Sequence, residues 1–268
     1  MSPIRTLLKK EWSDIARNRL LLVTMLLPAL LFLVISLVVI LVIPSMMKSD
    51  PARASIELRK VIHLFQNDPE LRQLDPNVLY LIHMLRQFLV LFLIVPVMSS
   101  LSIATYSIIG EKQNRTLEPL LATPITTAQL LIGKTLAATL PSVFLFWILF
   151  FLYAAGLFVF TPGIVPAHVL NRTAGLLIFL IGPLIAFLGL IVGVIVSARS
   201  TDPRSAQQIG AILILPVIGL FVSQLTGLFF LTLPMIFAGA VILILIDFFI
   251  FRAGVALFKR EKILTQWK

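Results

Sequence analysis

Six runs of apolar residues, each long enough to cross a membrane, constrain this chain more than any other feature. A helix needs about 20 apolar residues to span the hydrocarbon core of a bilayer. The runs lie at residues 20–43, 87–109, 132–160, 174–197, 207–227 and 229–251. Because 59% of the chain is hydrophobic and only 13% is charged, bilayer is the solvent that suits it. The sequence predicts an all-α, polytopic membrane protein with six transmembrane helices in a single domain over residues 1–268.

The last two runs form one nearly unbroken apolar stretch of about twice the spanning length. The chain therefore has to reverse somewhere within residues 223–234. Two interpretations fit the residues, a tight turn between two full spans or a re-entrant half-helix. The first run is too long for the apolar core of a signal peptide, and no small-residue cleavage pattern follows it, so we expect it to be retained.

Lysine and arginine placement predicts the orientation. The N-terminal tail, residues 110–134, the short segment after the fourth span and the tail at 252–268 share one side and carry most of the basic residues. The richer side is expected to face the cytoplasm. Both termini are then cytoplasmic, and residues 44–79 form an extracellular loop. The net charge of +10 indicates attraction to anionic lipid headgroups. The sequence has no basic patch interleaved with aromatic residues on a soluble domain, so a nucleic-acid partner is not expected.

The N-terminal tail, residues 1–19, has the pattern of an amphipathic interfacial helix. Its apolar residues recur at helical spacing, and its basic residues lie elsewhere on the helical wheel. The apolar set is Ile4, Leu7, Leu8, Trp12 and Ile15. A topology anchor and a docking element are equally compatible with this pattern.

Proline and glycine mark places where the spans bend or pack closely. Each span has one internal proline, which removes a backbone donor and bends a helix; the six are Pro28, Pro96, Pro141, Pro183, Pro216 and Pro234. Prolines are common in membrane helices generally, so they do not by themselves indicate moving helices. In the fourth span, Gly189 and Gly193 form a GxxxG pair. Such a pair predicts a surface on which another helix approaches closely.

Residues 110–131, between the second and third spans, are the one motif-rich polar interruption on the predicted cytoplasmic side. Thr116 is suited to cap a short helix, with Glu118 in its first turn and Pro119 where no amide donor is needed. Leu117, Leu120 and Leu121 then fall on one face. From the residues alone, this helix either docks into a groove of a soluble partner or lies on the membrane surface.

The run GEKQNRTLEPLLATP, followed by Leu131-Ile-Gly-Lys134, resembles the segment between spans two and three of type-2 ATP-binding-cassette (ABC) exporter permeases, including their sodium- and drug-extrusion branch. The loop STDPRSAQQIG at 200–210 resembles the turn between spans four and five of the same family. Together with six spans and a basic amphipathic tail, the resemblance covers essentially the whole chain. The long outer loop at 44–79 is less typical of the shortest family members.

The resemblance implies a permease subunit of the cell (cytoplasmic) membrane that exports a substrate. In such permeases the helix after span two is a coupling helix that docks into a separate ATPase subunit. By that analogy the docking residues here are Glu111, Arg115, Leu117, Glu118, Leu120 and Leu121, and the second cytoplasmic loop contributes Asp202, Pro203 and Arg204. Two ATPase copies would bind ATP and Mg²⁺, leaving this chain without a cofactor. A second permease chain, identical or homologous, would complete the assembly in the lipid bilayer.

Other chemistry is poorly supported by the residues. The segment Ala128–Thr135 loosely matches a phosphate-binding loop, but its interior is apolar and no strand precedes it. The sequence shows neither paired carboxylates nor a nucleophile–base pattern, so an enzyme is not expected. Asp247 is the one clearly intramembrane charge; it either pairs with Arg252 or snorkels, or it marks an ion site. The alternative function is therefore an ion-coupled secondary transporter or channel that acts without an ATPase.

Overall fold

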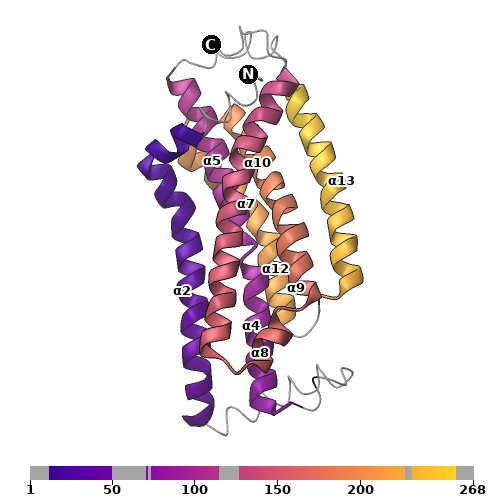
Figure 1. The fold of residues 1–268 in the computed structure, drawn as a ribbon. Helices are drawn as coiled ribbons and strands as arrows, with labels where there is room; N and C mark the ends of the chain where they lie inside the picture. The colour runs from indigo at the N-terminus through magenta and orange to yellow at the C-terminus, as the bar shows by residue number, and fades with distance from the viewer. Residues whose placement is uncertain (1–11, 50–70, 72–73, 115–126, 227–230, 258–268) are drawn as a thin grey trace.

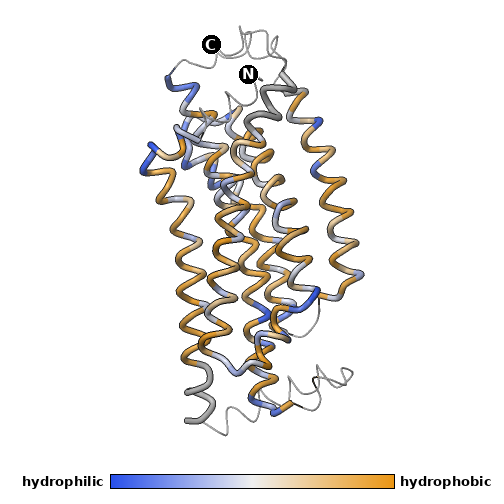
Figure 2. The backbone as a smooth tube through the Cα atoms, in the orientation of Figure 1, coloured by the Kyte–Doolittle hydropathy of each residue, from blue (hydrophilic) through white to orange (hydrophobic). Residues whose placement is uncertain are grey.

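The computed structural model describes residues 12–49, 71, 74–114, 127–226 and 231–257. Over these residues the regular structure is helical, and six helical stretches are long and apolar enough to cross a membrane, as predicted. They stand side by side as a bundle (Figure 1). Hydrophobic residues run along the middle of the helices, and hydrophilic residues gather toward the ends (Figure 2). The arrangement suits a bilayer, where backbone groups have to be satisfied within each helix.

The helices and their bounds set the frame for the candidate site. In chain order they are α2 (Arg19–Ser49), α4 (Pro76–Leu91), α5 (Ile94–Gln113), α7 (Thr127–Phe160), α8 (Ile164–Val169), α9 (Arg172–Leu176), the π-helix η2 (Leu177–Ile181), α10 (Gly182–Arg199), α11 (Pro203–Gly210), the 3₁₀ helix η3 (Ala211–Leu213), α12 (Ile214–Leu225) and α13 (Leu233–Leu257). Residues 12–17 are also helical.

The second span begins earlier than residue 87, inside the stretch predicted to be extracellular loop. Asp75 caps α4, because its side chain accepts a hydrogen bond from the amide of Asn77, and Pro76 occupies the start of the helix. α4 and α5 together make one candidate span, Pro76–Gln113. They are separated at residues 92–93, because Pro96 has no amide hydrogen and its ring crowds the carbonyl of residue 92.

The segment predicted as a loop at 200–210 is helical over most of its length. α11 begins at Pro203, directly after the capping residue Asp202, and leads through η3 into α12. α12 ends at Leu225 and α13 begins at Leu233. Since Pro203–Leu225 and Leu233–Val255 are both candidate spans, the arrangement favours two full spans over a re-entrant half-helix.

The contact between α5 and α10 forms the centre of the bundle. A Cβ placed on Gly189 would lie 2.6 Å from Ser100 Oγ and 2.9 Å from the carbonyl oxygen of Val97. One placed on Gly193 would lie 2.8 Å from the Cβ of Ala104. The prediction that this GxxxG pair admits a neighbouring helix is therefore confirmed, and the neighbour is α5. By contrast, much of α2, α12 and α13 exposes large apolar side chains.

Candidate functional site

Most basic side chains that the structure describes lie at one end of the bundle, here called the basic end. This end contains the start of α2, the last turns of α5, α10 and α13, and the first turn of α11. Its cations are Arg17, Arg19, Lys112, Arg199, Arg204 and Arg252. A buried cluster that includes Met25, Ile108 and Val194 joins α2, α5 and α10 beneath it. The opposite end has Arg86 and Arg172 among its described residues.

Lys112 ties the end of α5 to the end of α10. Its Nζ donates hydrogen bonds to the carbonyl oxygens of Ser197 (2.7 Å), Ala198 (2.7 Å) and Ser200 (3.2 Å). The last carbonyls of a helix have no partner within that helix, and a cation near them is favourable. Lys112 therefore caps α10 from a different helix. The half-buried ammonium fixes the two helix ends to each other.

The end of α10 and the start of α11 form a corner at the basic end, here called the α10–α11 corner. The start of α11 contributes the following contacts. Asp202 accepts hydrogen bonds from the amide (3.0 Å) and hydroxyl (3.3 Å) of Ser205. On the inner face Ala206 is fully buried, and Gln207 Nε2 donates to Thr105 Oγ1 at 3.4 Å. Asp202 and Arg204 remain exposed. The corner thus presents charged groups outward while its inner face packs on α5.

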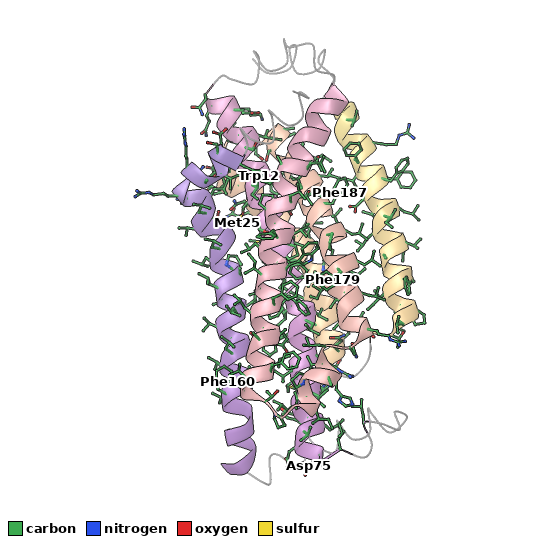
Figure 3. The ribbon with its side chains drawn as sticks, in the orientation of Figure 1. Trp12, Met25, Asp75, Phe160, Phe179 and Phe187 are labelled. Atoms are coloured by element: carbon green, nitrogen blue, oxygen red, sulfur yellow. The ribbon has the colours of Figure 1, made fainter. Side chains whose placement is uncertain are left out.

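Helical residues 12–17 pack against the same end of the bundle. Trp12, shown in Figure 3, donates from its indole nitrogen to the carbonyl oxygen of Ala137 in α7 at 3.0 Å. Ile15 is buried in the cluster with α5 and α10. This part of the predicted interfacial helix therefore contacts protein directly; Ile4, Leu7 and Leu8 lie outside the described residues.

Glu111 lies inward rather than on the outer surface. Its side chain is 8% exposed and lines a cavity of about 300 Å³ shared with Asp14 and Asn18. The other predicted docking residues, Arg115, Leu117, Glu118, Leu120 and Leu121, lie outside the described residues. α5 ends at Gln113, shortly before these residues in the chain.

Asp247 is buried in α13, 5% exposed. Neither carboxylate oxygen has a hydrogen-bond partner among the described residues. The guanidinium of Arg252 instead lies over the ring of Phe248, 5.7 Å from its centroid. Of the alternatives set out above for Asp247, pairing with Arg252 is therefore not the one that the structure shows.

A family model described as ABC-2 family transporter protein matches residues 5–238. The chain belongs to this family. It is accordingly the membrane component of an ABC transporter, a transport subunit whose family partner is an ABC ATPase. No curated protein matches the chain in sequence. The match covers α2 to the first turns of α13 and includes both the segment after α5 and the α10–α11 corner.

Sequence reasoning missed the role of Lys112 in joining α5 to α10 in this ABC-2 chain. In the sequence, Lys112 is only one of the cations in segment 110–134 that predict orientation, because its hydrogen-bond partners lie 85 to 88 residues away. A local sequence pattern cannot indicate a contact between residues so far apart in the chain. Asp202 and Pro203 were named from the family resemblance, and their part in docking stays a prediction; aspartate before proline is also a helix-start signal, and Asp202 does cap α11.

Proposed function

We propose that this chain is the permease subunit of an ATP-driven exporter, with its basic end in the cytoplasm of the cell. Two such chains, identical or homologous, would assemble with two ATPase subunits that bind ATP and Mg²⁺. The excess of described cations at the basic end supports this orientation. Family membership supports the ATPase partner. Export, rather than import, and a place in the sodium- or drug-extrusion branch follow from the resemblance of residues 110–134.

The observation that carries the proposal is the set of hydrogen bonds from Lys112 to the carbonyl groups at the end of α10, here called the Lys112 clamp. The segment 115–121, which carries five of the six predicted docking residues, follows α5 in the chain, and Lys112 is in the last turn of α5. Because its ammonium holds the end of α10 at 2.7 Å, a displacement applied to that segment reaches α5 and α10 together. α11 also packs on α5 through buried Ala206 and through Gln207. The central helices are therefore positioned to move as one unit when an ATPase pushes on the basic end.

Reconstitution tests this function. Proteoliposomes with the full chain alone are compared with proteoliposomes that also contain the cognate ATPase, using ATP-dependent efflux of candidate cargo as the readout. We expect efflux only when both proteins and ATP are present. Transport by the chain alone, at the same rate with and without the ATPase, would refute the proposal.

Asp247 is the observation that favours the second candidate, an ion-coupled transporter. Its buried carboxylate has no hydrogen-bond partner among the residues that the structure describes. Carboxylates inside the membrane are costly, and in other membrane proteins they mark ion pathways. On that account Asp247→Asn abolishes transport driven by an ion gradient in the absence of ATP. Under the ATPase mechanism the same variant has no gradient-driven activity to lose, so the two candidates separate in one assay.

A further inference from the structure

The outward face of α2 is a continuous apolar stripe, here called the α2 stripe. Its members recur every three or four residues and are each 49% to 58% exposed; they are Leu20, Val23, Leu27, Leu30, Leu31, Val34, Val38 and Leu41. The other face of the helix packs on α4, α5 and α7, and Met25, labelled in Figure 3, is buried there. The α2 stripe therefore faces away from the rest of the described bundle.

The length of the α2 stripe places its ends relative to a bilayer. From Leu20 to Leu41 an α-helix rises about 32 Å, which matches the hydrocarbon thickness of about 30 Å. Arg19 directly precedes the stripe and therefore lies at the edge of the hydrocarbon. Trp12, also near this end, has a half-exposed ring, and tryptophan is enriched at the boundary between membrane and water. The start of α2 is thus at the level of the lipid headgroups.

Two arginines are exposed at this level. Arg19 precedes Val23 by four residues, so it lies on the same face of α2 as the stripe. Arg17 ends the helical residues 12–17 and is exposed as well. Neither guanidinium forms a hydrogen bond or an ion pair with another residue that the structure describes. Asp14, three residues before Arg17, lines the cavity of about 300 Å³ described above. Both cations are therefore available to a group from outside the chain.

Asn18 fixes the backbone between the two arginines. Its amide nitrogen donates to the carbonyl oxygen of Asp14 at 3.1 Å, and its Oδ1 accepts from the amide of Leu21 at 3.0 Å. Asn18 therefore ends one helix and caps the next. Guanidinium groups bind phosphate oxygens with paired hydrogen bonds. A phosphate that both arginines contact would join the two helices.

We propose that Arg17 and Arg19 bind the phosphate of a phospholipid with a net negative charge, whose acyl chains lie along the α2 stripe. A zwitterionic lipid has the same phosphate but adds a cation, which the arginines repel. The proposal goes beyond the export function, because it assigns a lipid site that involves neither ATPase nor cargo.

The same observations favour lipid over the other possible occupants of this face. An acidic surface of a soluble partner could meet the arginines, but it would leave about 30 Å of apolar helix for the bilayer. A second copy that met this face about a two-fold axis normal to the membrane would bring like charges together.

Lipid quenching of a single fluorophore tests the site. The chain has no cysteine, so an uncharged fluorophore can be placed on Val23→Cys, one turn from Arg19 and 54% exposed. The full chain is reconstituted in phosphatidylcholine with added phosphatidylglycerol or phosphatidylcholine that carries a nitroxide near the head of one acyl chain. We expect phosphatidylglycerol to bind beside the fluorophore about fivefold more strongly, the size of the attraction between a basic side chain and an anionic membrane. Equal quenching by the two lipids overturns the proposal.

Two double variants locate the preference. Arg17→Gln with Arg19→Gln should lower the ratio of the two binding constants to about one. Arg199→Gln with Arg252→Gln is the matched control, because it removes the same charge from exposed side chains at the same end of the bundle, on α10 and α13. The control should keep the preference. An equal fall in both double variants would reflect the net charge of the whole chain and overturns the site.

Salt dependence and the absolute quenching complete the test. At about 1 M salt, exposed charges are screened beyond about 3 Å, so the preference for phosphatidylglycerol should shrink. A preference that salt leaves unchanged contradicts recognition by charge. Weak quenching by both lipids would mean that a second protein chain covers the stripe, which also overturns the proposal. Because no ATPase, ATP or cargo enters these measurements, their outcome is independent of the proposed export function.

Discussion

The Nζ atom of Lys112 and the carbonyl oxygen of Ser197 are 2.7 Å apart, although 85 residues separate them in the chain. This hydrogen bond, with those to Ala198 and Ser200, joins the last turn of α5 to the end of α10. Five of the six predicted docking residues lie in the segment 115–121, which begins three residues after Lys112. Lys112 therefore lies between the residues predicted to contact the ATPase and the packed helices at the centre of the bundle.

Removing the Lys112 ammonium should loosen this junction. Lys112→Met keeps much of the aliphatic stem but leaves the carbonyl groups at the end of α10 without their cation. We expect a loss of about 1–3 kcal/mol in the free energy of unfolding, measured by denaturant titration in mixed micelles. Gln113→Ala is the matched control: Gln113 is exposed and its bond to Thr201 is 3.3 Å long, so the change should stay within about 0.5 kcal/mol. Equal effects of the two variants would mean that the clamp adds no stability.

The close contact between α5 and α10 predicts a sharp dependence on glycine. Gly189→Ala places a Cβ 2.9 Å from the carbonyl oxygen of Val97, so the backbones have to separate. We expect a destabilisation of about 1–3 kcal/mol in the same titration. Gly175→Ala, whose Cβ meets nothing within 4 Å, should be neutral or slightly stabilising because alanine favours helix. A tolerated Gly189→Ala would indicate that the two helices do not approach this closely.

The capping residue of α11 can be tested without unfolding the protein. Asp202→Ala removes the acceptor for the Ser205 amide and should cost about 0.5–2 kcal/mol locally. Hydrogen–deuterium exchange of residues 204–207 should accelerate accordingly, while exchange in α13 stays unchanged. Asp202→Ser retains a capping oxygen and is expected to preserve most of the protection. Unaltered exchange in the alanine variant would argue that α11 does not depend on this cap.

The orientation can be tested directly because the chain has no cysteine. Single cysteines at exposed Ser205 and exposed Asn77 lie at opposite ends of the bundle. In intact cells, a membrane-impermeant maleimide should label the cysteine at 77 and should reach the cysteine at 205 only after permeabilisation. The reverse pattern would place the basic end outside and remove the ATPase from its proposed contact.

Sequence patterns predicted the spans well because the bilayer imposes a length that apolar runs reveal. The earlier start of α4 and the helical α11 were signalled by Asp75-Pro76 and Asp202-Pro203, since each pair places a capping acid before a proline at the helix start. The GxxxG pair indicated a close contact but not its partner. Lys112 could not be assigned, because its three carbonyl partners are brought near only by the folded bundle.

The most direct measurement of the central claim is transport-coupled ATP hydrolysis by the assembled complex that contains Leu117→Asp and Leu120→Asp in this chain. Asn114→Asp is the matched control, because it adds a negative charge at an exposed position just before the segment and changes little in shape. We predict that the control hydrolyses ATP and transports normally, whereas the double variant inserts into the membrane but neither retains the ATPase nor transports. Normal coupled hydrolysis by the double variant would contradict the account.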